Sequence, residues 1–577
     1  MSLDSRTAAH TLEQIAAYLE LHGENRFKAR AYDSAARALR GFESDDLVGA
    51  LETGQLAAVR GLGPATLAVV RDLVEHGQSL YLEQLRTTTP EGLLEMLRVP
   101  GMTPAKIYRI HEALGIETVD ELEEAARDGR LAKLPRYGKK TSAKVLAGIA
   151  FLRSRGTQRL YHHARAEGDQ LRAMVAAHPD VVRASVAGPL RRHCETVGNI
   201  DVVAGCSANP KAVAGSFTRI GGVKRSAGAG SSVEIVFVDG ITLRLHCALD
   251  HDFGLALLAA TGSSEHVGAV VTRLVERGFS LGAVGLEKDG SRIPTPDEKT
   301  VYAYADLDYV DPALREDLGE VGAAARHALP ALVTDGDIRG VLHCHTVYSD
   351  GKATVADMAR GAATRGWEYI GISDHSKAAF YAGGLTEKEL EAQMEEIDEL
   401  NAAGDSGATI LKGIEADILA DGRLDYGPDI LDRFDFVIGS IHSRFSMNAE
   451  AMTARVLRAL DEPRLTILAH PTGRLLLSRE PYALDMEAVL ERAAERRVAI
   501  ELNADPRRFD LDWRHLIRAR ELGVRIAIGP DAHSVNSLDN VFMGVGMARK
   551  GWLEADDVLN AGSATDVLAF ARARHEA

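Results

Sequence analysis

Seven short apolar runs dominate the sequence after residue 339, and helical stretches separate most of them. In chain order they read GVLHCH, YIGISDH, TILKGIEADI, DFVIGSIHS, LTILAHP, VAIELNA and VRIAIGPDAH. Strands that alternate with helices form parallel sheets, because each helix returns the chain to the same end of the sheet. The pattern therefore predicts a parallel, barrel-like arrangement in this part of the chain.

Every run except VAIELNA ends in side chains that can bind a metal ion. His343 and His345 are two residues apart on one predicted strand, so they point to the same face, and Asp531 and His533 repeat this spacing. Strand ends converge at one face of a barrel, so residues far apart in sequence meet around one cleft. The predicted ligands are His343, His345, Asp350, His375, Glu415, His442, His470, Asp531 and His533.

A single histidine at a strand end is more often structural than a metal ligand, but nine such groups at successive strand ends indicate metal binding. They exceed the about four ligands of one zinc ion, so two or three divalent ions are predicted. Nitrogen and oxygen donors suit Mn, Zn or Fe. Clustered ions without a thiolate ligand favour hydrolysis of phosphate esters, because one ion generates hydroxide and together they hold the attacking and leaving oxygens.

Three neighbours of this set have other predicted roles. Cys344 lies between two ligands, so it points to the opposite face of its strand and into the core. Glu501 and Asn503, from the run VAIELNA, suit support of the ligands or contact with substrate.

Residues 1–155 show almost only helical periodicity, broken at short intervals by glycine and proline. Three breaks are alike: VRGLGPATLAVVRDLV, RVPGMTPAKIYRIHEALG and LPRYGKKTSAKVLAGI. Each has the layout of a helix-hairpin-helix motif, whose turn glycines bring backbone N–H groups close to a phosphate, although one alone would equally fit a plain corner between helices. The predicted DNA contacts, independent of base sequence, are Gly61, Gly63, Gly101, Lys106, Gly138, Lys139 and Lys140.

The net charge of −16 at first argues against nucleic acid, because phosphate binding needs lysine and arginine. The charge is uneven, however: residues 1–160 hold 22 Lys and Arg against 21 Asp and Glu, and the rest of the chain holds 45 against 62. The global charge therefore does not decide the partner.

Targeting and redox signals are absent from the sequence. No apolar run reaches the about 20 residues that span a bilayer, and the N-terminus lacks the apolar stretch of a signal peptide. The four cysteines form no CxxC pair. We therefore expect a cytoplasmic protein without membrane contacts or disulfides.

The region from about residue 158 to 252 changes to β-branched runs bounded by glycine, among them IDVVAGC and ITLRLHCAL. The stretch VGNIDVV has the form of a strand on which a nucleotidyl transferase holds two carboxylates around metal ions. The first of these positions is Asn199 and only the second, Asp201, is acidic. Helices and short strands return over residues 253–325.

Motifs along the whole chain resemble a known family. HCHTVYSDG, SDHS, GIEADI, IHS, AHPTGR, ELNADPRRFDL and PDAHS are similar to the polymerase-and-histidinol-phosphatase (PHP) domain. ENRFKARAYDSAARAL, GPLRR, TGSSEH and DPALREDLGE are similar to bacterial family X DNA polymerases (PolX), which carry that domain at the C-terminus.

The resemblance implies a multidomain α and α/β protein with DNA-binding helix-hairpin-helix motifs. The implied domains are an N-terminal helical domain (1–80), a fingers-like domain (81–155), a polymerase-beta-like palm (156–252) and thumb (253–322), a linker (323–338) and a PHP domain with a distorted (βα)7 barrel (339–577).

The resemblance also implies a role in DNA repair at gaps or 3′ ends. Its metal cluster would act as a 3′-to-5′ exonuclease, and AP-endonuclease and 3′-phosphatase activities occur in the family. Glu415, Asp350 and His375 would be catalytic, with Glu415 bridging two ions, and Arg474 would hold the substrate phosphate.

Three positions depart from the family's polymerase site. Pro189 replaces a serine, Asn199 replaces the first metal carboxylate, and Thr242 falls where the third carboxylate belongs. Because Mg²⁺ relies on charged oxygens, one carboxylate would hold Mg²⁺ or Mn²⁺ weakly, and we expect polymerase activity to be absent or weak. The degenerate nucleotide site retains Gly188, Arg192 and Asp201.

Three alternatives stay open at this point. The chain is a functional Mn-dependent gap-filling DNA polymerase, a small-molecule phosphatase of the histidinol-phosphatase type, or a non-catalytic scaffold that binds DNA ends. The three glycine turns argue against the second of these.

Overall fold

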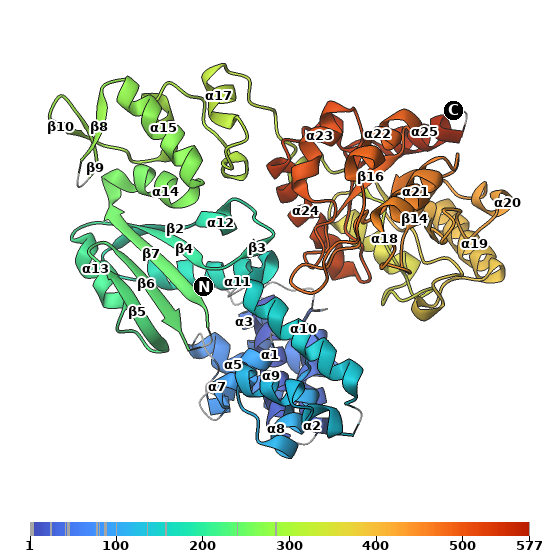
Figure 1. Cartoon of the computed structure of the whole chain (residues 1–577), viewed down its shortest axis with the longest axis horizontal. Coiled ribbons are helices and arrows are strands. Elements are labelled where there is room, and N and C mark those ends of the chain that lie inside the picture. The colour runs from blue at the N-terminus through green and yellow to red at the C-terminus, as the bar shows by residue number, and fades with distance from the viewer. Residues whose placement is uncertain are drawn as a thin grey trace. The chain divides into compact units, whose positions relative to one another are not determined.

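The computed structural model describes residues 5–575 except 24–25, 41, 43–46, 77–78, 80, 83, 86–88, 98, 100, 136, 156–157, 239 and 283–284. The chain divides into two compact units, one of residues 1–157 with 238–240 and one of residues 158–237 with 241–577. Figure 1 labels the helices and strands of both units.

The regular elements described in the first unit are all helices, as predicted. One apolar core lies among α1 (Ser5–Leu21), α2 (Arg26–Arg40), α3 (Leu47–Glu52), α4 (Gln55–Ala58) and α5 (Pro64–His76). A second core lies among α7 (Glu91–Met96), α8 (Pro104–Leu114), α9 (Val119–Arg127) and α10 (Lys139–Arg155). Local sequence sets the helix starts: the Thr103 side chain caps α8, whose first residue is proline, and Thr118 with Glu121 forms a capping box on α9.

The second unit begins with a mixed sheet, which we call the palm. Its strand order is β2 (Val181–Ala187), β4 (Ile200–Cys206), β7 (Thr242–Leu249), β6 (Ser232–Phe237) and β5 (Val223–Ala229). Only β4 and β7 run parallel, whereas β6 and β7 pair antiparallel. Alternate residues of β4 (Val202, Ala204 and Cys206) enter one core with residues of α11 (Tyr161–Ala176) and α13 (Pro210–Phe217).

The thumb follows the palm in sequence. It consists of α14 (Phe253–Thr261), α15 (Ser264–Glu276), strands β8 (Phe279–Gly282), β9 (Gly285–Lys288) and β10 (Ser291–Ile293), α16 (Glu298–Tyr304) and α17 (Glu320–Ala325). The buried His266 of the TGSSEH motif lies with Nδ1 2.6 Å from Glu320 Oε1 and Nε2 2.8 Å from the Tyr302 hydroxyl. This histidine therefore has a structural role.

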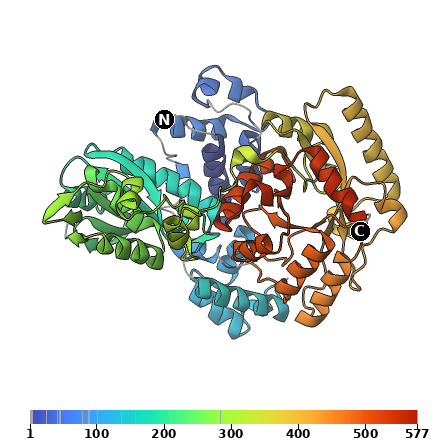
Figure 2. The same ribbon diagram turned by 90° about the horizontal axis from the view of Figure 1, so that it is seen from above.

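The last part of the chain forms the predicted parallel barrel. Seven strands are hydrogen-bonded in sequence order: β11 (Gly340–Val341), β12 (Tyr369–Ile372), β13 (Thr409–Asp417), β14 (Phe436–Ser440), β15 (Ile467–Leu468), β16 (Ala499–Asn503) and β17 (Ile526–Gly529). In Figure 2 the yellow-to-red helices surround these strands. They are α18 (Val355–Thr364), α19 (Glu387–Ala403), α20 (Pro428–Leu431), α21 (Ala449–Leu460), α22 (Met486–Arg496), α23 (Leu516–Glu521), α24 (Asn540–Lys550) and α25 (Ala564–His575).

Two sets of contacts join the first and last strands of the barrel. Beyond the strand ends, Ala532 N donates to His343 O at 3.1 Å and His345 N donates to Ala532 O at 2.8 Å. Deeper in the barrel the buried Asn560 amide donates to Gly340 O at 2.9 Å and to Ile528 O at 3.2 Å, and its oxygen accepts from Ile528 N at 2.8 Å. The seven-stranded sheet is therefore nearly closed.

The segment predicted as a linker, 323–338, packs against the barrel. Val333 is fully buried, its N–H donates to Leu553 O at 2.9 Å, and its carbonyl accepts from the Arg549 guanidinium at 2.9 Å. The segment therefore connects the thumb to the barrel through specific contacts and not as a free linker. Across the described part of the chain, no helix has the length and apolar character to cross a membrane.

We expect Asn560→Leu to lower the free energy of unfolding of the barrel by about 3 kcal/mol, because it keeps the volume but leaves one N–H and two carbonyls buried without partners. Urea unfolding followed by tryptophan fluorescence measures this, since all three tryptophans (367, 513 and 552) belong to the barrel part of the chain. Asn448→Ala, which removes only the exposed cap of α21, is the control and should cost about 1 kcal/mol. Equal losses in the two variants would contradict the role of Asn560.

Candidate metal centre

The nine predicted ligands come from the carboxyl ends of six of the seven strands. His343 and His345 follow β11, and Asp531 and His533 follow β17 at the same offsets of two and four residues. Glu415 lies two residues before the end of β13, and His442 and His470 each lie two residues beyond the end of their strands. The fold brings all nine side chains together at one end of the barrel, in four overlapping groups whose ligand atoms lie within 4.8 Å of one another.

Glu415 lies at the centre of these groups. Its Oε2 is 2.7 Å from His375 Nδ1, and its Oε1 is 3.1 Å from His470 Nε2. It belongs to two of the four groups, as do His343, His345 and His375. The four groups are His345–Asp350–His375–His533, His343–His345–Glu415, His343–His470–Asp531 and His375–Glu415–His442.

Buried nitrogen and oxygen atoms in the centre lack hydrogen-bond partners among the described residues. They include both ring nitrogens of His345, His343 Nε2 and Glu415 Oε2. Burying polar atoms without partners costs free energy, so native proteins rarely do it. Imidazole and carboxylate are the usual ligands of divalent Mn, Zn and Fe, so this donor set fits metal ions.

Outer carboxylates orient two of the imidazoles. His343 Nδ1 lies 2.6 Å from Glu501 Oε1, and His442 Nδ1 lies 2.6 Å from Asp417 Oδ1. A carboxylate at Nδ1 holds the proton there and leaves Nε2 as the acceptor that faces the centre. The sequence suggested the role of Glu501 but missed Asp417, two residues after Glu415 and on the same side of β13.

The charges of the centre depend on one another. Burial alone would raise the pKa of Glu415, but His375, His442 and His343 hold it well below its usual range. Burial opposes charge on His442, yet Glu415 and Asp417 raise its pKa to about 10. The central carboxylate therefore stays ionised at neutral pH and attracts cations.

Two of the nine residues have unusual backbone conformations. His470 has φ of 25° and Asp531 has φ of 49°, a region that residues other than glycine rarely adopt. Such conformations persist where the surrounding structure enforces them, often at functional sites. Glu501 Oε2 accepts a hydrogen bond from His470 N at 2.8 Å, and the Asn503 amide donates to Asp531 Oδ2 at 3.1 Å.

Arg474 corrects the expectation drawn from the resemblance. Its guanidinium is buried and donates to Asp512 Oδ2 at 2.8 Å, to Glu195 Oε1 at 3.0 Å and to backbone carbonyls, including Arg508 O at 3.0 Å. It joins the barrel to the palm, and its contacts use four of the five guanidinium N–H groups. Arg508 lies closer to the centre, with Nε 3.5 Å from Asp531 Oδ2, and its side chain is 20% exposed. The ELNADPRRFDL motif contains this residue, but sequence spacing did not single it out.

The degenerate palm site is closed by its own hydrogen bonds. Asp201 is buried, accepts from the Asn199 amide at 2.7 Å and lies 3.3 Å from His246 Nε2. Arg244 of β7 is the register partner of Asp201, and His246 lies two residues further along the same face of β7. Positions 242, 244 and 246 on this face of β7 hold no carboxylate. Gly188 has φ of 64°, and a Cβ there would lie 2.2 Å from Asp201 Oδ2.

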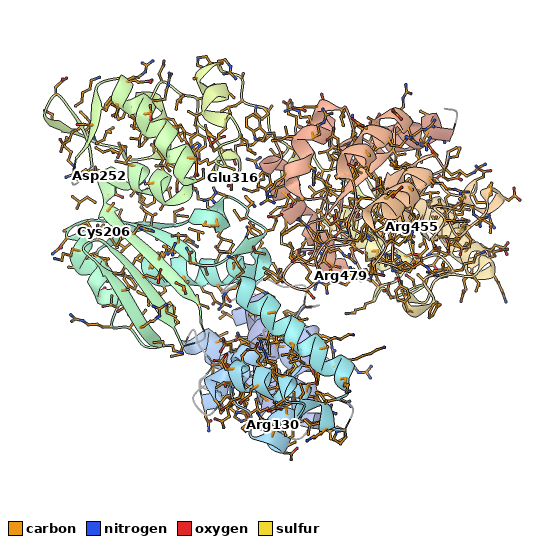
Figure 3. All side chains as sticks on the ribbon, viewed as in Figure 1. Arg130, Cys206, Asp252, Glu316, Arg455 and Arg479 are labelled. Carbon is orange, nitrogen blue, oxygen red and sulfur yellow. The ribbon has the colours of Figure 1, made fainter. Side chains whose placement is uncertain are left out.

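Arg192, predicted to bind phosphate, is held by the thumb. It donates to Glu316 Oε1 at 2.8 Å and to Thr261 O at 2.7 Å. Glu316, labelled in Figure 3, also accepts from Lys550 of the barrel, which is 1% exposed. A nucleotide would have to compete with this buried ion pair.

The glycine turns of the first unit are open to a ligand. Gly61 and Gly101 have φ of 106° and 82°, and a Cβ on Gly63, Gly101 or Gly138 would meet no atom within 4 Å. Lys106 Nζ donates to Gly101 O at 2.6 Å, which fixes the second turn. Lys139 and Lys140 are exposed at the start of α10.

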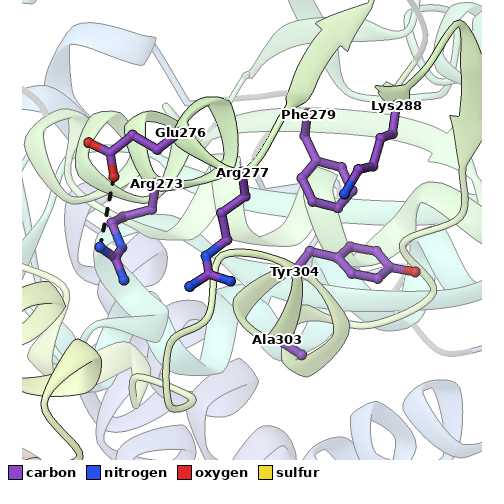
Figure 4. Close-up of a pocket in the computed structure, with 7 residues that line it drawn as sticks. All are labelled: Arg273, Glu276, Arg277, Phe279, Lys288, Ala303 and Tyr304. Atoms are coloured by element: carbon purple, nitrogen blue, oxygen red, sulfur yellow. Dashed lines mark ion pairs between the residues drawn. The ribbon is translucent and has the colours of Figure 1, made fainter.

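Figure 4 shows a shallow pocket on the thumb. Lys288 lies 4.4 Å from the centroid of the Phe279 ring, which stacks on Tyr304. Arg273 and Arg277 pair with Glu276 and Asp306. Because acidic partners offset the two arginines, the pocket has little net charge for an anion.

Comparisons with known proteins agree with this division of the chain. The profile of the PHP domain matches residues 342–505, and that of the DNA polymerase beta thumb matches 256–316. The profile of a helix-hairpin-helix domain matches 6–79, and that of a SAM-like helix-hairpin-helix tandem matches 93–150.

Relatives fall into two kinds. The DNA polymerase/3′-5′ exonuclease PolX of Bacillus subtilis is 35% identical over 97% of this chain and 98% of its own length. A probable phosphatase of Caldanaerobacter subterraneus subsp. tengcongensis is 33% identical over 33% of this chain and 74% of its own length. A probable phosphatase of Clostridium acetobutylicum is 27% identical over 34% of this chain and 80% of its own.

We expect Glu501→Gln to weaken binding of Mn²⁺ or Zn²⁺ by about 10- to 100-fold, because the amide holds His343 and His470 less firmly and adds no negative charge. Titration of the metal-free full chain, followed by elemental analysis, measures the change. Glu491→Gln makes the same chemical change on an exposed position of α22 and should bind metal as the wild type does. Unchanged affinity in Glu501→Gln would show that the carboxylate does not support the ligands.

Proposed function

The chain belongs to the PolX family with a C-terminal PHP domain, and on this premise we propose that its barrel hydrolyses DNA phosphodiesters as a 3′-to-5′ exonuclease. The relative of similar length carries this activity in its name. The observation that carries the proposal is the set of nine convergent ligands around Glu415, with buried ligand atoms that lack partners among the described residues.

Two or three divalent ions, Mn or Zn and also Fe, fit the four ligand groups. When bound, they would supply Lewis acidity and hydroxide at neutral pH for in-line attack on a phosphodiester. His343, His470 and Asp531 would hold one ion, His375, Glu415 and His442 another, and His345, Asp350 and His533 would hold a third. Glu415 lies where it would be shared between ions.

The exposure of the ligand side chains indicates the side from which a substrate would reach the centre. The side chains of Asp350 and His533 are 38% and 36% exposed, whereas Glu415 and His343 are 1% exposed. The scissile phosphate would approach from the side of Asp350 and His533. Arg508, beside Asp531, carries the positive charge that would hold a phosphate oxygen.

The rest of the chain would position DNA. The exposed glycine turns and Lys139 and Lys140 suit backbone phosphates of gapped or 3′-ended substrates, and base excision repair is the context that fits such substrates. AP-endonuclease and 3′-phosphatase activities would use the same centre. The palm would be a scaffold with absent or weak polymerase activity, because Asp201 is the lone carboxylate among the three positions predicted to hold metal ions and Arg192 is engaged.

A second candidate is hydrolysis of small phosphomonoesters. The relatives named probable phosphatases support it, because about a third of this chain matches 74% and 80% of their own length. The helix-hairpin-helix regions favour DNA instead, because a small substrate needs no backbone contacts. Comparing phosphate release from histidinol phosphate with shortening of end-labelled DNA separates the two.

We expect the double variant His343→Ala/His345→Ala to lose at least about 1,000-fold in exonuclease rate, because the two histidines contribute to three of the four ligand groups. The measurement is shortening of a 5′-labelled gapped duplex with Mn²⁺, beside gel-shift binding of the same duplex. Binding should persist, since the glycine turns are untouched. Full nuclease activity in the variant would rule out the metal centre as its source.

We expect primer extension on gapped DNA to be undetectable with Mg²⁺ and at most slight with Mn²⁺, because one carboxylate holds these ions weakly. Any extension should be compared between the wild type and Asp201→Ala. Robust extension that disappears in Asp201→Ala would establish a functional polymerase and contradict the scaffold role of the palm.

A further inference from the structure

The loop between His375 and Leu385 carries two aromatic side chains outside the ligand set. Phe380 is 84% exposed, more than any other large apolar side chain in the described part of the chain, and Tyr381 is 61% exposed. Single exposed apolar residues are common on protein surfaces. Two adjacent aromatic rings at the edge of a polar centre need a specific explanation.

The loop itself is firmly anchored. Ala379 and Ala382, on either side of the rings, are buried, and Ala378 N donates to Asp425 Oδ2 at 2.9 Å. Leu385 N donates to His375 O at 2.8 Å, and a Cβ on Gly384 would lie 2.0 Å from Ser376 O. The backbone is therefore fixed by contacts at both ends, and it presents the two rings outward.

The rings border the metal centre directly. Tyr381 meets His442 edge to face, with centroids 6.3 Å apart and planes at 74°. Phe380 meets Tyr381 in the same manner, at 5.9 Å and 78°. Burial, with the carboxylates of Asp417, Glu415 and Asp350, raises the pKa of Tyr381, in agreement with a hydroxyl turned toward the centre.

The electrostatics of this rim favour a nucleobase as the partner of the rings. Asp350, Glu415, Asp417 and Asp531 repel a phosphate backbone wherever metal ions do not neutralise it. A strand whose terminal phosphodiester lies at the centre must place the adjoining bases at the rim. Aromatic side chains bind unpaired bases by stacking, which needs no charge and tolerates every base.

We propose that Phe380 and Tyr381 form a stacking platform for the unpaired nucleobase at the 3′ end of the strand being degraded. This inference rests on the proposed exonuclease function and deepens it, because it assigns the two side chains that would bind the terminal base of the substrate. A paired terminal base is buried in the duplex stack and would first have to unpair.

Steady-state hydrolysis by the full chain tests the platform. The substrates are a single-stranded oligonucleotide and the same oligonucleotide with an abasic 3′-terminal residue. We expect Phe380→Ala to lower kcat/KM on the first by roughly 5- to 100-fold, mainly through KM, and to have little further effect on the abasic substrate, which has no base to stack. Phe380→Trp should restore activity on the first.

A binding measurement provides a second, independent readout. A 3′-terminal 2-aminopurine, joined by a phosphorothioate that slows hydrolysis, loses fluorescence when it stacks. Wild type and Phe380→Trp should quench it, and Phe380→Ala should not. Val182→Ala, a change at another exposed apolar residue, is the control and should behave as wild type in both assays.

The outcomes separate the two levels of the proposal. If the wild type degrades neither oligonucleotide, the exonuclease function fails and the platform fails with it. If the wild type is active but Phe380→Ala lowers kcat/KM equally on both substrates, only the platform is overturned. The same holds if Phe380→Ala quenches the fluorescence of 2-aminopurine as strongly as the wild type does. Unchanged kinetics with an altered sedimentation coefficient would likewise overturn it and identify the rings as a contact between protein chains.

Discussion

The burial of Glu415 among imidazoles is the constraint on which the catalytic end of the barrel depends. A carboxylate 1% exposed to solvent has a large desolvation penalty unless positive charge surrounds it. Here that charge comes from five histidines that follow four different strands, and these meet because all strands run parallel and end at one face. The parallel strands and the closure by Asn560 bring the histidines to Glu415, and Glu501 and Asp417 hold two of them in place. All of these features therefore help to keep positive charge around the buried carboxylate.

Other buried ion pairs hold the palm and the thumb to the barrel. Arg474 of the barrel donates to Glu195, and Lys550 of the barrel reaches Glu316 beside Arg192. Removing one partner of a buried ion pair is strongly destabilising, because the other charge stays buried. These residues tie palm, thumb and barrel together, so a change at any of them would affect more than one domain.

Much of the barrel was readable from the sequence because its signal is local. The offsets of two residues at His343/His345 and Asp531/His533 are a direct consequence of strand geometry, and apolar runs marked the strands. The resemblance to PolX, drawn from motifs along the chain, is confirmed by the full-length similarity. The predicted fold class is confirmed by the helical domains, the thumb and the parallel seven-stranded barrel, whereas the segment predicted as a linker is packed against the barrel.

The sequence could not predict contacts between side chains that are far apart along the chain, because they depend on how domains and strands pack. Arg474 follows a ligand histidine closely and its motif suggested a phosphate contact, but its partner Glu195 is nearly 280 residues away. The contact between His246 and Asp201 likewise depends on the register between β4 and β7, which sequence patterns do not give. Asp417 has the same offset of two from Glu415, but the prediction did not use it, and Arg508 has no spacing signal because arginines are common in any chain.

The engagement of Arg192 also bears on whether the palm could regain its chemistry. Restoring an aspartate at position 199 would add a carboxylate but would leave the arginine bound to Glu316 and Thr261. Freeing Arg192 would require a change at Glu316, which also neutralises the buried Lys550 of the barrel. A palm able to bind a nucleotide would therefore leave a charge unpaired in the barrel.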